Sequence, residues 1–208
     1  MHPAMENSRV RVLHASPDAP AVDIYVDGSP VITNLAFGQF SDYATLSPGR
    51  HQIQVFPAGP LGAGMPVIAT SAEFASNESY TIAAVGNLDS IQPVVLLDTT
   101  SPPAPDMAKV RVFHASPDAP SVDVQTRGGT KLLKNISFKE TTPFAEVTAG
   151  IVDLDIVPSG STEPVLSILG YPLEAGNLYT FVALGLLKGM PGFKVVAIVD
   201  AVTIPMPL

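Results

Sequence analysis

The heptapeptide His-Ala-Ser-Pro-Asp-Ala-Pro occurs twice in this chain, at residues 14–20 and again at residues 114–120. A histidine, a serine and an aspartate are the side-chain types of a serine hydrolase. The surroundings differ from those of such an enzyme, because no G-x-S-x-G elbow is present and Pro17 removes the backbone N–H that would follow Ser16. The sequence therefore predicts no enzyme and no catalytic residue here, and a hydrolase is kept only as the last alternative.

A bend in the chain explains the motif better. Pro17 presets the backbone for the first corner of a type I turn, and Pro20 forces the residue before it into an extended conformation that leads to the next strand. His14 then continues the inward face of the preceding strand, with a ring nitrogen bonded to a backbone carbonyl or to Asp23. The predicted residues of this structural corner are Ser16, Pro17, Pro20, Ser116, Pro117 and Pro120.

Metal binding is the main chemical alternative for the same segment. Imidazole and carboxylate groups near each corner have the ligand types of a divalent-ion site, with Ca²⁺ the ion that suits carboxylates and carbonyls. The candidate ligands are His14, Asp18, Asp23, His114, Asp118 and Asp123. Their spacing matches neither a D-x-D-x-D-G loop nor an H-x-x-x-H pair. The favoured prediction is a protein without a cofactor, and a Ca²⁺ site is the alternative.

The two motifs belong to a tandem repeat. Residues 9–23 match residues 109–123 at 12 of 15 positions, and weaker matches continue in register toward the end of each copy. A period of about 100 residues corresponds to a whole domain rather than to a solenoid unit. The predicted organisation is a flexible tail over residues 1–8, a first repeat over 9–98, a Pro-rich linker over 99–108 and a second repeat over 109–208.

Apolar residues alternate along each copy with the period of a β-strand. In "RVRVLH", Val10, Val12 and His14 face one side, whereas the residues between them face the other. The 21 prolines and 16 glycines interrupt the chain too often for long helices. These patterns predict an all-β fold of two tandem immunoglobulin-like or transthyretin-like antiparallel β-sandwich domains, with a small Greek-key barrel as the alternative.

Composition excludes several classes of function. The chain is 46% hydrophobic and 14% charged, which is typical of a compact globular protein. Its formal charge of −8 and the absence of a Lys/Arg-rich run argue against a nucleic-acid partner. With no cysteine it has neither a disulfide nor a thiol nucleophile. Its apolar runs are too short for a transmembrane segment, and its first residues lack the pattern of a signal peptide.

The ordered segments "VRVLHASPDAPAVDIYVDG", "NLAFGQFSDYATLSPGRHQIQVFPAG" and "YTIAAVG" closely resemble the family called domain of unknown function 4397, and both copies fit this pattern. The second copy departs from it where "VQTRGG" (124–129) replaces the "YVDG" hairpin. The resemblance implies β-sandwich domains of bacterial or archaeal surface or secreted proteins, without an established activity. It implies a cell-surface or extracellular location, with a cytoplasmic or spore-associated one as the alternative because no export signal is visible.

These observations lead to one functional prediction with an alternative. We predict a non-enzymatic structural or adhesion module of the cell envelope or surface that acts through protein–protein or self-association contacts, as a fibre or oligomer. The apolar segment "VTIPMPL" (202–208) is a candidate for adding a strand to a neighbour's sheet. The alternative, from a different class, is a domain that binds a small ligand or a divalent ion.

Overall fold

The structure is a computed structural model that describes residues 7–59, 64–98 and 100–200. The segment 202–208 and most of the predicted tail lie outside the described residues. The chain divides into two compact units, Met1–Thr99 and Thr100–Leu208. None of the helices in the described ranges has the length and hydropathy needed to cross a membrane.

Short strands make up both units. The first contains β1 (Ser8–Ala15), β2 (Val22–Val26), β3 (Ser29–Leu35), β4 (Ala44–Leu46), β5 (Gly49–Pro57), β6 (Ile68–Phe74), β7 (Ser79–Val85), the 3₁₀ turn η1 (Leu88–Ser90) and β8 (Gln92–Leu97). The second contains β9 (Met107–His114), β10 (Val122–Thr126), β11 (Lys131–Ile136), β12 (Ala145–Thr148), β13 (Gly150–Pro158), β14 (Leu166–Leu173), β15 (Leu178–Leu184) and β16 (Lys194–Asp200). Strand β9 thus begins inside the predicted linker, and β1 begins at the last residue of the predicted tail.

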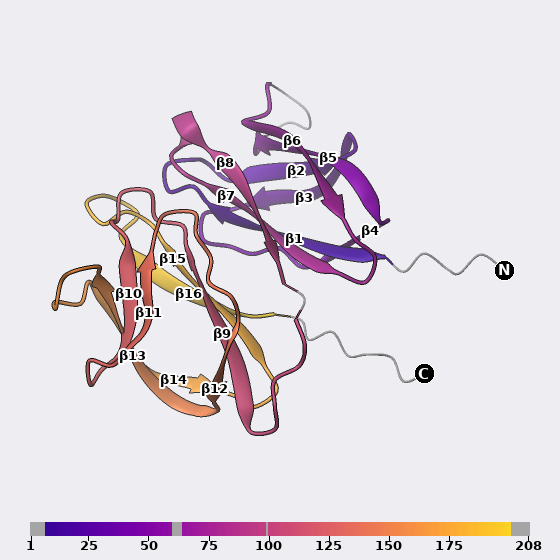
Figure 1. Ribbon diagram of the computed structural model, residues 1–208. Coiled ribbons are helices and arrows are strands. Elements are labelled where there is room, and N and C mark those ends of the chain that lie inside the picture. The colour runs from indigo at the N-terminus through magenta and orange to yellow at the C-terminus, as the bar shows by residue number, and fades with distance from the viewer. Residues whose placement is uncertain (1–6, 60–63, 99, 201–208) are drawn as a thin grey trace. The chain divides into compact units, whose positions relative to one another are not determined.

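Each unit is a sandwich of two four-stranded sheets (Figure 1). The sheets of the first unit have the strand orders β4-β1-β7-β8 and β3-β2-β5-β6. Those of the second have the orders β12-β9-β15-β16 and β11-β10-β13-β14, which are the same orders with the corresponding strands. The structure confirms the predicted all-β fold of two tandem sandwiches.

One strand pairing in each unit is parallel. Strand β1 runs parallel to β7, from Arg9 opposite Ser79 to Ala15 opposite Val85, and β9 runs parallel to β15 in the same way. The other pairings between strands are antiparallel. The sequence predicted antiparallel sheets throughout, because alternation of side chains indicates which face a residue occupies and carries no signal for strand direction.

The apolar core of each unit lies between its two sheets. In the first unit the alternating residues predicted to face inward are buried, with Val12 3% and Ile53 1% exposed. In the second unit the corresponding core includes Val112, Val124 and Ile156. The corner motif carries the chain from one sheet to the other, from β1 to β2 and from β9 to β10. It therefore fixes how the two layers of each sandwich are joined.

Candidate functional site

The imidazole of His14 closes the first corner. Its side chain is fully buried, with its ring edge-to-face against Phe37 at 6.3 Å. The Nε2 atom lies 2.8 Å from the carbonyl oxygen of Pro20, and Nδ1 accepts the backbone N–H of Ser16 at 3.3 Å. Since a carbonyl oxygen only accepts, Nε2 carries the proton and Nδ1 is the acceptor. One neutral tautomer thus satisfies both ends of the bend.

His114 makes the same contacts in the second corner. Its Nε2 donates to the carbonyl of Pro120 at 3.1 Å, its Nδ1 accepts the N–H of Ser116 at 3.4 Å, and its ring packs against Phe138. Desolvation by burial lowers the pKa of both imidazoles, although the hydrogen bond to the proline carbonyl opposes this shift. Both rings are therefore neutral near pH 7, and both nitrogens of each ring are occupied.

The aspartate of each motif fastens the corner to a neighbouring loop. Asp18 accepts the backbone N–H of Leu88 at 2.8 Å, in the turn that follows β7. Asp118 accepts two backbone N–H groups, from Leu187 at 2.7 Å and from Lys188 at 2.9 Å, in the loop that follows β15. Both aspartates thus accept backbone N–H groups from the loop that follows the paired strand, and not from the bend itself.

Neither serine hydroxyl of the motif is hydrogen-bonded to the motif histidine, although Ser116 Oγ lies 3.4 Å from Asp118 Oδ1. Ser116 Oγ donates to the carbonyl of Gly185 at 2.7 Å. Ser16 is fully buried, and its Oγ has no hydrogen-bond partner among the described residues. In both corners the histidine nitrogen nearest the serine is taken by the serine's own backbone N–H. The arrangement lacks the hydroxyl-to-imidazole hydrogen bond that activates a serine nucleophile.

Asp23 and Asp123 each bond to the neighbouring strand where its pairing register is irregular. Asp23 accepts the backbone N–H of Asn34 at 2.7 Å, and Asp123 accepts that of Asn135 at 2.8 Å. Both asparagines have positive φ, 56° and 54°, a conformation that Asn tolerates better than most residues. The hydrogen bond from Lys131, 2.5 Å from the Asp123 carboxylate, is the largest cause that lowers the pKa of Asp123 to about 2.

The six candidate metal ligands are therefore engaged in separate hydrogen bonds. The motif histidine bonds across its corner, the motif aspartate bonds the next loop, and the second aspartate bonds the neighbouring strand. Across residues 7–59, 64–98 and 100–200, the structure forms no group of three His, Cys, Asp or Glu side chains arranged to hold a metal ion.

A buried polar cluster on β1 and β7 was missed from the sequence. Arg11 Nε donates to Thr81 Oγ1 at 2.8 Å, and that hydroxyl donates to Asp98 Oδ2 at 2.6 Å. The Arg11 guanidinium also lies 3.7 Å from Asp98. Tyr43 adds a hydrogen bond to the same carboxylate oxygen at 2.8 Å, and its ring lies 4.7 Å from the guanidinium. The side chains of Arg11, Thr81 and Asp98 are each at most 2% exposed.

The second unit repeats this cluster with one change. Arg111 donates to Thr180 at 2.7 Å, Thr180 donates to Asp200 at 2.5 Å, and the arginine lies 3.8 Å from the aspartate. The aromatic ring under the guanidinium is Phe144, 4.5 Å away, in place of a tyrosine. The sequence signal was the recurrence of these polar residues at equivalent repeat positions.

An ion pair occurs at the end of one hairpin in the first unit. His51 Nδ1 lies 2.6 Å from Asp27 Oδ2, and Nε2 lies 2.8 Å from the carbonyl oxygen of Ser47. The hydrogen bond to Asp27 is the largest cause that raises the pKa of His51. The backbone N–H of Gln52, followed by His51, lowers the pKa of Asp27. The second unit has Val152 where the first has His51, so it lacks this pair.

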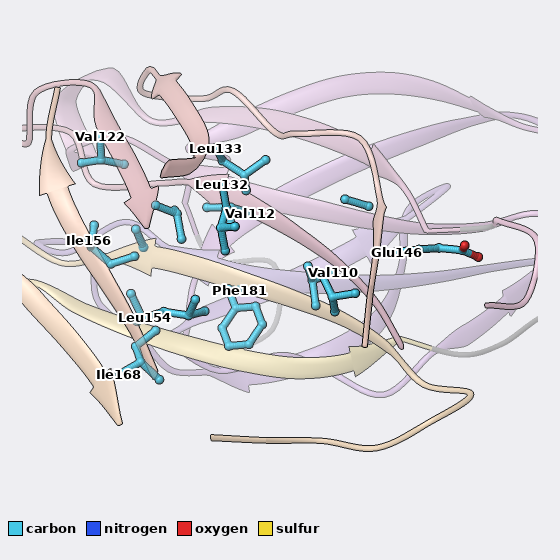
Figure 2. A pocket seen from close by; sticks show the side chains of 15 residues that line it. Val110, Val112, Val122, Leu132, Leu133, Glu146, Leu154, Ile156, Ile168 and Phe181 are labelled. Carbon is cyan, nitrogen blue, oxygen red and sulfur yellow. The ribbon is translucent and has the colours of Figure 1, made fainter. Parts of the chain in front are cut away.

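A cavity of about 240 Å³ lies between the two sheets of the second unit (Figure 2). Its lining is apolar apart from Glu146 and comes from the facing strands of both sheets. The lining residues are Val110, Val112, Val122, Val124, Leu132, Leu133, Ala145, Glu146, Val147, Leu154, Ile156, Ile168, Phe181, Ala183 and Val195. Sequence analysis did not single out this region, because its residues show only the ordinary alternation of a sandwich core.

The corner motif and the strands around it coincide with a known family. The family model described as "Domain of unknown function (DUF4397)" matches residues 8–125, more than half of the 208-residue chain. The chain belongs to this family. The DUF4397 match covers the first unit from Ser8 and extends into β10 of the second. None of the curated proteins matches the chain.

Two solved structures are similar to the chain at low identity. The TIE protein of Bacillus anthracis is 8% identical over 87% of this chain, with a TM-score of 0.30, and the chain spans only 34% of that protein. The "putative cell adhesion protein" from Parabacteroides distasonis is 10% identical over 97% of this chain and 99% of its own length, with a TM-score of 0.26. Neither likeness is close enough to assign a function to this DUF4397 chain.

Proposed function

We propose that the protein is a non-enzymatic structural or adhesion module of a cell envelope or surface, acting through protein–protein or self-association contacts. The polar groups of both corner motifs support the non-enzymatic part of this proposal. Each histidine uses both ring nitrogens within its own corner, and each aspartate binds backbone N–H groups. These side chains hold the two layers of a sandwich together and are not available for proton transfer.

The exposed outer edge of β14 supports the proposed role in protein–protein association. Strand β14 is the last strand of its sheet, and no strand among the described residues pairs with its outer edge. Its eight residues, LSILGYPL, contain no charged side chain, and Leu169 is 56% exposed. Soluble proteins commonly protect an edge strand with lysine or other charged residues, because unpaired N–H and C=O groups accept a further strand. Pro172 has no N–H to donate, so the uncharged part of this edge that suits strand addition by a partner or a second copy is residues 166–171.

The corresponding edge of the first unit provides a comparison within the same chain. Strand β6 occupies the same place in its sheet, but its sequence IATSAEF carries Glu73 and is less apolar. We therefore propose that the protein associates through the β14 edge of the second unit. The cell-surface location comes from the family resemblance, and surface labelling of intact cells would test it.

The proposal is tested by measuring the assembly state of the whole protein. Size-exclusion chromatography with light scattering over a range of concentrations should show oligomers for the natural protein. Leu169→Lys places a charge on the β14 edge and should shift the population to monomer. The matched control is Ala69→Lys, at an exposed position of the β6 edge, which should leave association unchanged. A natural protein that stays monomeric at high concentration would contradict the self-association form of the proposal.

A partner other than a second copy is tested with the same variants. Cross-linking on intact cells should capture a protein partner with the natural protein and with Ala69→Lys, and lose it with Leu169→Lys. A hydrolytic activity that disappears in Ser16→Ala and Ser116→Ala variants of normal stability would overturn the non-enzymatic assignment. A melting temperature that rises with Ca²⁺ and falls with EDTA would restore the alternative of an ion site.

A further inference from the structure

The hollow core of the second unit has a filled counterpart in the first. At the equivalent place between the sheets, the first unit contains a void of only about 10 Å³, compared with about 240 Å³ in the second. The two sites use corresponding strands, because Val10 and Val12 line the small void and Val110 and Val112 line the large one. The same fold therefore packs tightly in one copy and leaves room in the other.

Two lining positions have smaller side chains in the second unit, although Phe181 is larger than Ile82, whose place it takes. Ile24 and Leu46 line the void of the first unit, whereas Val124 and Val147 occupy the corresponding positions in the second. Strand register supports both correspondences. Ile24 pairs with Val55 as Val124 pairs with Ile156, and Leu46 pairs with Ser8 as Val147 pairs with Ala108. Each of these changes removes one methylene group from the core.

The core side chains on the sheet that contains β13 are also arranged differently. In the first unit Phe74 is 1% exposed and stacks against His51 at 6.0 Å. Leu173 takes the place of Phe74 in the second unit, since both lie opposite the glycine that begins the neighbouring strand. Ile53 is fully buried, but its counterpart Leu154 is only half-buried. The second unit has its aromatic rings at other positions, because Tyr171 and Phe181 pack against this core where the first unit has Ala72 and Ile82.

The side chains that line the cavity favour an apolar ligand over water. A buried water needs two to four polar partners, and the lining offers one polar side chain, Glu146. One oxygen of that carboxylate accepts the backbone N–H of Ala104 at 3.1 Å. Figure 2 shows Glu146 at one end of the group of lining side chains. Apolar cavities of this kind stay dry and bind small hydrocarbons, since a cavity of about 150 Å³ accepts benzene.

The cavity has an entrance and an elongated form. Leu132 on β11 is 50% exposed, and Glu146 on β12 is also exposed. Both strands are edge strands, each at the end of its own sheet, so the cavity opens where these two edges meet. The labelled side chains in Figure 2 extend from Val122 and Ile156 at one end to Val110 and Glu146 at the other. This form suits a linear chain better than a compact ring.

We propose that the second unit binds one aliphatic chain of about eight to ten carbons in this cavity, with the polar end of the ligand in solvent between β11 and β12. The size follows in proportion from the benzene cavity, because about 240 Å³ accommodates roughly ten non-hydrogen atoms. This site does not depend on the association proposed for β14. Loss of ligand binding and loss of assembly are therefore separate results.

The test is a titration of the full-length protein with 1-octanol, followed by NMR of labelled Ile, Leu and Val methyl groups. Saturable shifts are expected for methyl groups of Val124, Val147 and Leu154. The core methyl groups of Ile24 and Leu46 in the first unit should not shift. Ethanol at the same concentration is the control for a general solvent effect and should give no saturable shift. Absence of saturable shifts with 1-octanol, or equal shifts in both units, would overturn the proposal.

A second test fills the cavity by giving two lining positions of the second unit the larger residues of the first unit. The double change Val124→Ile with Val147→Leu should weaken 1-octanol binding at least tenfold. Val147→Leu alone is the fallback if the double variant fails to fold, and it should weaken binding by a smaller factor. The matched control, Ile151→Val, changes a side chain that is 78% exposed on β13 and should leave the affinity unchanged. Unchanged affinity in folded filled variants would contradict the site.

Discussion

The two units of this protein share one topology and the same buried polar interactions, but they differ in how their apolar cores are packed. The corner histidine, the loop-binding aspartate and the buried arginine cluster occur in both. The void between the sheets is about 10 Å³ in the first unit and about 240 Å³ in the second. Buried polar groups tolerate little change because an unpaired one is costly, whereas apolar packing can vary by single methylene groups.

The strongest test of this comparison is to break the buried arginine cluster in each unit. Asp98→Ala and Asp200→Ala remove the carboxylates that face Arg11 and Arg111, and each aspartate is at most 2% exposed. Loss of one partner of a buried ion pair typically costs about 3–5 kcal/mol. Urea unfolding should show a loss of this size for both variants, with hydrogen exchange locating it in the altered unit. A loss below about 1 kcal/mol would show that the cluster is not a structural joint.

Tyr43→Phe is the graded control for the same cluster. It gives the first unit the ring type that Phe144 already supplies in the second. The expected cost is about 1.5–3 kcal/mol, because a hydrogen bond to a buried carboxylate is lost while the ring stays under the guanidinium. A cost as large as that of Asp98→Ala would mean that the tyrosine, and not the arginine–aspartate pair, holds the cluster.

Removing the corner imidazole should have a similar effect in both units. His14→Ala and His114→Ala each leave a proline carbonyl and a serine N–H without their partner and open a cavity in a fully buried place. We expect a loss of about 2–4 kcal/mol for each. Chemical denaturation with unit-resolved hydrogen exchange measures it. Normal stability combined with loss of a ligand or an activity would instead indicate a functional site.

Exchanging core residues should change stability by a smaller amount and in opposite directions. Ile24→Val with Leu46→Val gives the first unit the smaller residues of the second, and we expect it to cost about 1–3 kcal/mol in total. Val124→Ile with Val147→Leu should stabilise the second unit by roughly 1 kcal/mol, because added methylene groups fill existing space. Thermal unfolding of both variants tests this. Destabilisation of the second unit by the larger residues would show that the cavity is not available to them.

The smallest expected difference is in pH dependence. The raised pKa of His51 means that its ion pair contributes stability below the unfolded value near 6.5, and this contribution is lost as pH rises through the folded value. The lowered pKa of Asp27 means that its contribution is present above the ordinary value and is lost in acid. The buried histidines act oppositely, because the unfolded chain takes up a proton below about 6.5 that the folded corner excludes.

Acidification from about pH 8 to pH 5 should therefore weaken the second unit more than the first. Unfolding of the natural protein and of His51→Val, followed at several pH values by hydrogen exchange, measures the difference. The variant should make the first unit as sensitive to acid as the second, since the second has a valine at this position. Identical pH profiles of the two units in the natural protein would contradict the role given to the His51–Asp27 pair.

Alternation and repetition predicted much of the fold from the sequence. Val12, Ile24 and Ile53 have the period of a half-buried strand, and Pro17 with Pro20 marks the bend. Both are local signals, because they depend on neighbours within a few residues. Because the sequence is repeated, each predicted feature occurs in both units. The recurrence of the motif supports its interpretation as a structural corner.

The other features depend on partners that are distant in the sequence. Arg11 was expected on an outward face, but its partner Asp98 directly follows β8, about 90 residues later, and both are buried. The parallel pairing of β1 with β7 has no local signature. The cavity depends on how differences in both directions combine, such as Val124 for Ile24 and Phe181 for Ile82. No single residue type in the sequence indicates such a space.

The most direct test of the structural corner is an NMR titration of the His14 and His114 imidazole nitrogens in the full-length protein. Both rings should be neutral at pH 7 with the proton on Nε2, and both should titrate below the ordinary pKa. His51 in the same spectra should titrate above it and serves as the internal comparison. A proton on Nδ1, or titration of either corner histidine at its ordinary pKa, would contradict the assignment of this motif as a structural joint.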